Sequence, residues 1–207
     1  MEDSFYKDSI VLLEGAIADI KAKIDIIRDY NIAHQNRDVI NYITTRVKSE
    51  ESMKEKLVRR GFEVTLENAL TKIYDAAGIR IICSYVDDCY KVAEMLKKCR
   101  DMKLIQEKDY IKNPKENGYR SYHMVFLLDL DIAGEIYPVY VEIQIRTIAM
   151  DFWAALEHEI KYKKNIKNPE MIAQELKNCA DQIATTDLNM QTLRNMINND
   201  ENESISE

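Results

Sequence analysis

A polar stretch at residues 109–123 combines turn-forming residues with cations and aromatic rings. Pro114 and the pair Asn117-Gly118 predict a turn between two apolar runs. The other notable side chains of the stretch are phosphate-binding donors and stacking surfaces: Tyr110, Lys112, Lys115, Tyr119, Arg120, Tyr122 and His123. A plain hairpin connection and a binding loop explain this composition about equally well, so the chemistry of the other segments has to decide.

Two carboxylates lie at strand positions where they could hold a magnesium ion. Asp75 comes just before one apolar run, and Glu142 lies inside a later one. Mg²⁺ is usually bound by one or two carboxylates together with substrate phosphates. Glu142, Gln144 and Arg146 alternate with apolar residues, so they share one face of a strand. That face is either exposed to solvent or the floor of a site.

Basic side chains on neighbouring segments could neutralise a polyphosphate. Arg46 and Lys48 point to one face of a predicted strand, and Lys56 and Arg59 share a face of the helix that follows. Arg80 lies inside a core strand and needs an anionic partner. Solvated charged faces and a structural ion pair are the competing interpretations. Cations, two carboxylates and a ring that could stack on a base together indicate phosphoryl or pyrophosphoryl transfer involving nucleotides.

Several other classes of function find no support in the sequence. It contains no P-loop, no glycine-rich dinucleotide fingerprint and no nucleophile elbow. The four cysteines form no Cys-x-x-Cys pair and the three histidines form no cluster with them, so we expect reduced thiols and no zinc site. Without a signal-peptide pattern or a membrane-length apolar run, we expect a cytoplasmic protein with no membrane partner. The formal net charge of −7 means that local basic clusters must hold any polyanion.

The hydrophobic pattern predicts an α+β fold with a mixed sheet of about five strands flanked by helices. The expected strands are residues 42–48, 79–85, 102–108, 121–130 and 136–146. The expected helices are residues 4–30, 50–60, 66–74, 87–98, 150–162 and 169–197. The first helix carries an apolar seam from Ile10 to Ile27, which could pack on the domain's own core or against another subunit.

Five motifs follow one another in a recognisable order. They are Arg46-Val-Lys48-Ser, Asp75-x-x-Gly78-x-Arg80, Asp109-Tyr-Ile-x-x-x-Lys115-x-x-Gly118-Tyr119-x-Ser121-x-His123, Glu142-Ile-Gln144-Ile-Arg146-Thr147 and Trp153-Ala-x-Leu-Glu157-His158. The chain therefore resembles the synthetase domain of the RelA/SpoT homologue family, and most closely its small alarmone synthetases of the RelQ-like branch. The resemblance spans roughly residues 39–163, and its specificity comes from the order of all five motifs.

The resemblance implies a nucleotidyltransferase-like fold and a GTP diphosphokinase reaction. In that reaction the β,γ-pyrophosphate of ATP moves to the 3′-hydroxyl of GTP or GDP, giving (p)ppGpp and AMP. The chain shows no His-Asp hydrolase motif, so we expect no (p)ppGpp hydrolysis. The alternatives are a catalytically silent module of the same fold that binds guanine nucleotides or RNA, and an enzyme that transfers a nucleotidyl group.

The resemblance also implies a role for each matching residue. Asp75 and Glu142 would be the catalytic pair that holds Mg²⁺, and Glu142 would also position or deprotonate the 3′-hydroxyl. The residues implied for ATP are Arg46, Lys48, Lys56, Arg59 and Arg80. The residues implied for the guanine nucleotide are Lys115, Tyr119, His123, Gln144 and Arg146, with Tyr119 stacked on the base. Glu157 and His158 match the last motif and join the site only weakly.

The resemblance and the composition together suggest how the chain is divided. We expect an N-terminal helical extension at residues 1–35, a synthetase domain at 36–165, a C-terminal helix at 166–197 and a disordered acidic tail at 198–207. The resemblance further implies a homotetramer held by the terminal helices. It also raises an alarmone as an allosteric ligand.

Overall fold

A computed structural model describes residues 5–35, 37–162 and 167–205. Its core is one mixed sheet in the order β1-β2-β5-β4-β3. The strands are β1 (Ile40–Val47), β2 (Ala77–Cys83), β3 (Met102–Asp109), β4 (Tyr122–Ile132) and β5 (Glu135–Thr147). Only the β2–β5 pair is parallel among these strands, and the other three pairs are antiparallel. The predicted α+β class and the five-stranded mixed sheet are confirmed.

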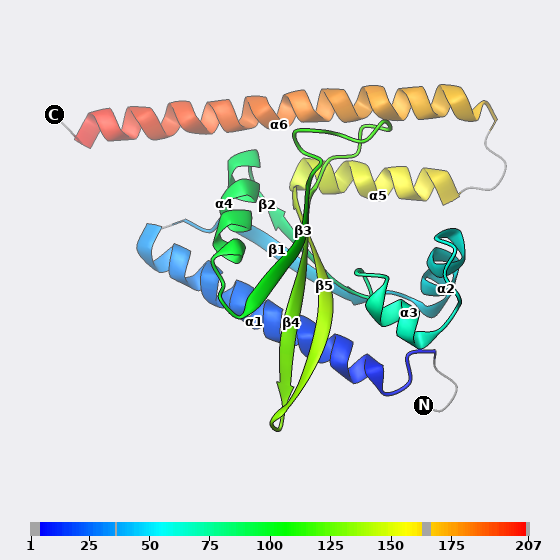
Figure 1. The fold of residues 1–207 in the computed structure, drawn as a ribbon. Coiled ribbons are helices and arrows are strands. Elements are labelled where there is room, and N and C mark those ends of the chain that lie inside the picture. The colour runs from blue at the N-terminus through cyan, green and yellow to red at the C-terminus, as the bar shows by residue number, and fades with distance from the viewer. Residues whose placement is uncertain (1–4, 36, 163–166, 206–207) are drawn as a thin grey trace.

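Six helices surround the sheet in the described part of the chain. They are α1 (Ser9–Gln35), α2 (Glu50–Arg59), α3 (Leu66–Thr71), α4 (Val86–Lys97), α5 (Ile148–Tyr162) and α6 (Pro169–Ile205). Figure 1 shows α1 running across the sheet, α2 and α3 grouped beside it, and α5 and α6 lying side by side. Among the described helices, none combines the length and the apolar character that crossing a bilayer requires.

The strand register brings polar side chains of four strands into one row. Thr44 on β1 lies opposite Arg80 on β2, Arg80 lies opposite Gln144 on β5, and Gln144 lies opposite His123 on β4. The alternate residues of β5, including Ile143, are buried in the core because strand side chains alternate between faces. The row therefore lies on the face of the sheet opposite the core.

The apolar seam of the first helix packs on the sheet of its own chain. Leu13, Ile17, Ile20 and Ile24 are buried, and α1 contacts β1, β2, β4 and β5. Of the two interpretations of this seam, packing on the domain core is therefore the one that the fold supports. The helix begins at Ser9 rather than at residue 4, after a turn at residues 5–8.

The C-terminal helix is longer than the sequence pattern predicted. It was expected to end at residue 197, before a disordered tail, yet α6 continues to Ile205. Once a helix has formed, each further residue adds one backbone hydrogen bond, so a polar extension can remain helical. Residues 206–207 lie outside the described part. The Trp153 indole N–H donates to the Leu176 carbonyl at 2.9 Å, which fixes α6 against α5.

Candidate active site

Two cavities share one wall at the central strand β5. The larger, of about 510 Å³, is lined by side chains of α2, β3, β4 and β5 and by the loop between β3 and β4. The smaller, of about 220 Å³, is lined by β1, β2 and β5. Asp75, Glu142 and Gln144 line both cavities. A group held by these side chains would be within reach of molecules bound in either cavity.

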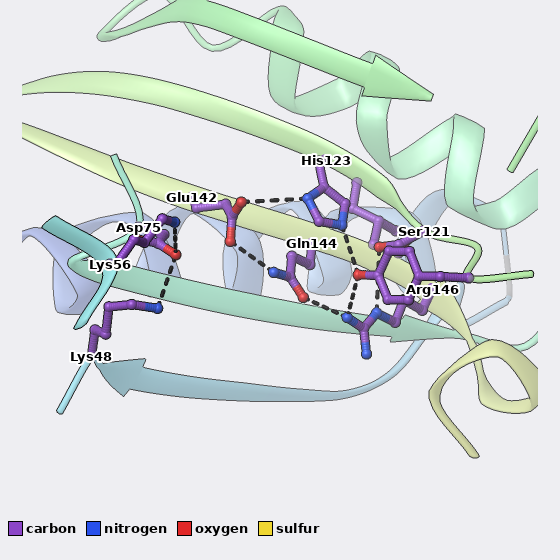
Figure 2. A network of polar contacts seen from close by, with 10 residues as sticks. Lys48, Lys56, Asp75, Ser121, His123, Glu142, Gln144 and Arg146 are labelled. Carbon is purple, nitrogen blue, oxygen red and sulfur yellow. Dashed lines mark hydrogen bonds and ion pairs between the residues drawn. The ribbon is translucent and has the colours of Figure 1, made fainter. Parts of the chain in front are cut away.

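Asp75 lies between α3 and β2 and is held by two lysines. The Nζ atoms of Lys48 and Lys56 lie 3.0 Å and 2.6 Å from the same oxygen, Oδ2 of Asp75 (Figure 2). The Lys48 backbone N–H donates to the Ala76 carbonyl at 2.8 Å, which brings the end of β1 to this carboxylate. The second oxygen, Oδ1, is buried and has no hydrogen-bond partner among the described residues. Both lysines therefore use Oδ2, and neither uses Oδ1.

Glu142 is held as a carboxylate by its neighbours on β4 and β5. Gln144 donates to Glu142 Oε2 at 2.7 Å, and His123 Nδ1 lies 3.4 Å from Oε1 (Figure 2). Burial alone would raise the pKa of Glu142, but the bonds from His123 and Gln144 and the charge of Lys56 lower it to about 2. Glu142 is consequently ionised at every physiological pH.

Mg²⁺ fits this pair of carboxylates provided that substrate oxygens complete its shell. Within the described ranges, no three His, Cys, Asp or Glu side chains come together in the manner of a site built from protein ligands alone. Asp75 and Glu142 line the same two cavities, and Oδ1 of Asp75 is available. Two carboxylates completed by phosphates is the usual arrangement for Mg²⁺.

His123 is neutral near pH 7 and links Glu142 to Tyr119. Burial lowers the pKa of His123 and outweighs the attraction of the Glu142 carboxylate. Because the carboxylate can only accept, the ring proton belongs on Nδ1, which leaves Nε2 to accept from the Tyr119 hydroxyl at 2.8 Å. The chain of hydrogen bonds fixes the position of the Tyr119 hydroxyl.

Arg146 follows Glu142 and Gln144 on the same face of β5 but lines neither of the two cavities. Its side chain is buried, and its Nη2 donates to the Tyr119 hydroxyl at 2.6 Å and to Gln144 Oε1 at 2.7 Å. Its Nη1 pairs with Asp151 at 3.0 Å, and Asp151 also pairs with Arg80 at 3.1 Å. With these partners, Arg146 holds Tyr119 and Gln144 in place, and its expected contact with the guanine nucleotide stays a prediction.

The Tyr119 ring lines the larger cavity and has two cations close to it. Lys115 Nζ lies 4.6 Å from the ring centre and 4.8 Å from that of Tyr110, and Arg146 Cζ lies 5.1 Å from the Tyr119 ring. Burial lowers the pKa of Lys115, with Glu142 opposing it. A base that stacks on Tyr119 would take the place of the Lys115 ammonium, which would then be free to meet a phosphate.

The loop that carries Tyr119 is anchored on α5 and α6. Asn117 donates to Glu157 Oε1 at 2.9 Å, and Arg120 pairs with Asp181 at 3.1 Å. Gly118 has a φ of +88° and packs so closely on α6 that an added Cβ would lie 2.5 Å from Cβ of Ala180. Glycine is therefore required here both for its backbone conformation and for its size.

The residues predicted from sequence do not all reach the cavities. Arg46 and Arg80 line the smaller cavity, while Lys56, Lys115, Tyr119 and His123 line the larger one. Arg59 is exposed, and Arg59 and His158 line neither of the two. Glu157 does line the larger cavity.

Sequence reasoning missed several residues that line the larger cavity. They are Arg60, Tyr74, Gln106, Lys108 and Val125. One signal could have revealed some of them. Gln106, Lys108 and Tyr110 alternate along β3 and its end, and all three line this cavity.

Comparison with known proteins decides the family. A family model described as "Region found in RelA / SpoT proteins" matches residues 45–167. The chain belongs to the RelA/SpoT family. The resemblance found in the motifs is thus confirmed.

Individual members of the RelA/SpoT family resemble this chain over nearly its whole length. It is 42% identical to the GTP pyrophosphokinase YwaC of Bacillus subtilis, over 87% of this chain and 85% of that protein. It is 35% identical to the GTP pyrophosphokinase YjbM of the same organism, over 94% of this chain and 90% of that protein. Its fold matches the structure of the B. subtilis small alarmone synthetase 1 bound to its product pppGpp, with a TM-score of 0.85. The two sequences are 36% identical, and the match covers 93% of this chain and 97% of that chain.

Proposed function

We propose that this member of the RelA/SpoT family is a GTP pyrophosphokinase. It transfers the β,γ-pyrophosphate of ATP to the 3′-hydroxyl of GTP or GDP and releases AMP. The observation that carries this proposal is the shared wall of the two cavities, where Asp75 and Glu142 face both. A reaction between two nucleotides needs one place that both reach, because positioning supplies much of the rate acceleration.

ATP is assigned to the smaller cavity and the acceptor to the larger one. Arg46 and Arg80 line the smaller cavity and would meet the donor nucleotide. Tyr119 and Lys115 line the larger cavity, where the ring would stack on guanine and the ammonium would meet its phosphates. Lys48 and Lys56 lie at the boundary on Asp75 and are placed to pair with the transferring phosphates.

The two carboxylates share the work at the reacting centre. Asp75 and Glu142 would hold Mg²⁺, which neutralises phosphate charge when bound. Because the pKa of Glu142 is about 2, its carboxylate is a weak base. Its low basicity favours a role in accepting a hydrogen bond from the 3′-hydroxyl and orienting it, over early removal of the proton.

Incubation with Mg²⁺, ATP and either GTP or GDP tests the proposal, with nucleotides resolved by anion exchange. AMP should appear in step with a guanosine nucleotide that carries two more phosphates. Release of free pyrophosphate would indicate nucleotidyl transfer, and binding without turnover would indicate a silent module. (p)ppGpp added with Mg²⁺ should remain intact, since we propose that the chain has no hydrolase activity.

The proposal extends to the setting of the enzyme. We place it in the cytoplasm, where its nucleotide substrates are found, and as a homotetramer joined through its terminal helices. An alarmone is the proposed allosteric ligand. Equilibrium dialysis with (p)ppGpp, alone and with a non-hydrolysable ATP analogue, would detect such binding as sites in excess of one per active site.

A further inference from the structure

The turn that precedes α1 is docked onto α2, the helix that carries Lys56. The backbone N–H of Phe5 donates to Glu50 Oε1 at 2.9 Å, and Lys54 Nζ lies 5.2 Å from the centre of the Phe5 ring. Figure 1 shows this start of the chain beside α2 and α3. The next residue, Tyr6, is only 2% exposed and belongs to the hydrophobic core.

Tyr6 and Asp75 each have a buried polar atom that lacks a partner. Among the described residues, the hydroxyl of Tyr6 and Oδ1 of Asp75 are two of three buried side-chain polar atoms without a hydrogen bond. Leaving such a group unpaired is costly, because it loses its hydrogen bond to water and gains none in the protein. The two groups are also electrostatic neighbours, since burial and then the charges of Asp75 and Glu50 raise the pKa of Tyr6 to about 12.

Packing alone does not account for a tyrosine at this position. A phenylalanine would fill the same volume without an unpaired hydroxyl, so a partner that the hydroxyl gains in another state of the site would explain why a tyrosine stands here. The partners of Asp75 in the present state are the ammonium groups of Lys48 and Lys56, both on Oδ2. These two lysines are the cations that the proposed reaction directs towards ATP phosphates.

We propose that Tyr6 is a positioning residue for Asp75, whose carboxylate takes a hydrogen bond from the Tyr6 hydroxyl, directly or through one water, when nucleotide and Mg²⁺ bind. As Lys48 and Lys56 turn to the phosphates, this bond keeps the carboxylate oriented towards the metal. Carboxylates that bind metals are commonly held by such hydrogen bonds, and removing one weakens metal affinity or activity about 10- to 100-fold. The inference rests on the proposed function through the metal role of Asp75.

Replacing Tyr6 by phenylalanine isolates the hydroxyl. Mn²⁺ binding to the protein with a non-hydrolysable ATP analogue, followed by electron paramagnetic resonance, should weaken about tenfold in Tyr6→Phe. The Mg²⁺ concentration for half-maximal turnover should rise by a similar factor. The melting temperature without ligands should not fall, because the hydroxyl has no partner there. Tyr137→Phe is the matched control, since its hydroxyl bonds Glu135 in the β4–β5 hairpin.

A double-mutant cycle shows whether Tyr6 acts through Asp75. The tenfold effect of Tyr6→Phe on Mn²⁺ affinity should vanish in an Asp75→Asn background. Equal Mn²⁺ affinity of Tyr6→Phe and the parent protein, or an effect that persists in Asp75→Asn, would overturn the inference. Neither result touches the proposed reaction, which fails instead if the parent protein forms no pppGpp or ppGpp from ATP.

Discussion

Glu142 places a negative charge at the wall that the two cavities share. Glu142→Gln keeps the size of the side chain but removes its charge and replaces one of its two accepting oxygens with an NH2 donor. We expect turnover to fall at least about a hundredfold, because the proposed metal ligand and the proposed orienting acceptor would be lost together. Affinity for guanine nucleotide should change less than turnover, because Arg146 still donates to the Tyr119 hydroxyl when the link through His123 is weakened. Product formation and calorimetric titration measure the two quantities.

Glu135→Gln provides the control for this substitution. Glu135 begins the same strand, β5, at the exposed hairpin end, and it lines neither cavity. Its turnover should stay within about twofold of the parent protein, as for most surface substitutions. Substantial turnover in Glu142→Gln would remove the metal and orienting roles from this residue.

At the scale of single residues, the sequence located the carboxylates but not all of their neighbours. Glu142 could be found because strand alternation fixes which side chains share a face, and Asp75 because it comes just before an apolar run that forms a core strand. Arg60, the residue that follows α2, lines the larger cavity, whereas the predicted Arg59 does not. The relation between Tyr6 and Asp75 could not be predicted, because only tertiary packing brings such distant positions together.

At the scale of elements, hydrophobic periodicity identified the helices and strands but not what covers them. The seam of α1 had the spacing of a helix interface, and the structure shows it buried on the sheet. Periodicity reports that one face of an element is apolar, whereas the partner of that face depends on the path of the whole chain. The contact of Gly118 with α6 likewise depends on the path of the whole chain, so local sequence could not predict it.

The packing contact between α6 and the loop that carries Tyr119 can be tested at Gly118. In Gly118→Ala, a positive φ and the clash with Ala180 should together lower the free energy of unfolding by roughly 2–4 kcal/mol. The KM for guanine nucleotide should rise more than the KM for ATP, because the loop carries Tyr119, the ring proposed to stack on guanine. Urea unfolding and steady-state kinetics measure these effects.

Two further variants separate strain from steric overlap. Gly134 has a φ of +91° and no atom near an added Cβ. Gly134→Ala should therefore lower the free energy of unfolding by the cost of backbone strain alone, about 1–2 kcal/mol. Adding Ala180→Gly to Gly118→Ala should recover the part due to the clash. No recovery in the double variant would mean that the loop does not rest on α6 as described.

The contribution of Asp187, a buried residue of α6, to the stability of the protein depends on pH. Burial outweighs the hydrogen bond from Thr147 and raises the pKa of Asp187. The folded protein therefore binds this proton more readily than the unfolded chain, so the contribution to stability is greatest at low pH and is lost as pH rises through the raised pKa. Asp187→Asn should melt a few degrees higher than the parent protein at pH 8, and the difference should shrink towards pH 4.

Asp129→Asn is the control for the calorimetric comparison, since Asp129 is exposed on β4. It should show no pH-dependent difference from the parent protein between pH 4 and pH 8. A lower melting temperature of Asp187→Asn at pH 8 would mean that the charged form of Asp187 stabilises α6.

At the scale of the whole molecule, apolar side chains remain exposed on the second half of α6. They are Leu188, Met190, Leu193, Met196 and Ile197, each more than half exposed. Figure 1 shows the end of α6 extending past α4. Deleting residues 1–30 is a poor test of assembly, because it would remove the buried seam of α1 together with any contact surface.

Substitution on α6 tests the proposed homotetramer without disturbing the core. Met190, Leu193 and Ile197 follow helical spacing and form one apolar stripe, and an exposed stripe of this kind is typical of a contact surface. Light scattering should give about four times the chain mass for the parent protein and a smaller assembly for Leu193→Glu combined with Ile197→Glu. Asn195→Glu adds charge to an exposed position of the same helix and should leave the mass unchanged. A parent protein of single-chain mass, or an unchanged assembly in the double variant, would mean that this stripe does not join subunits.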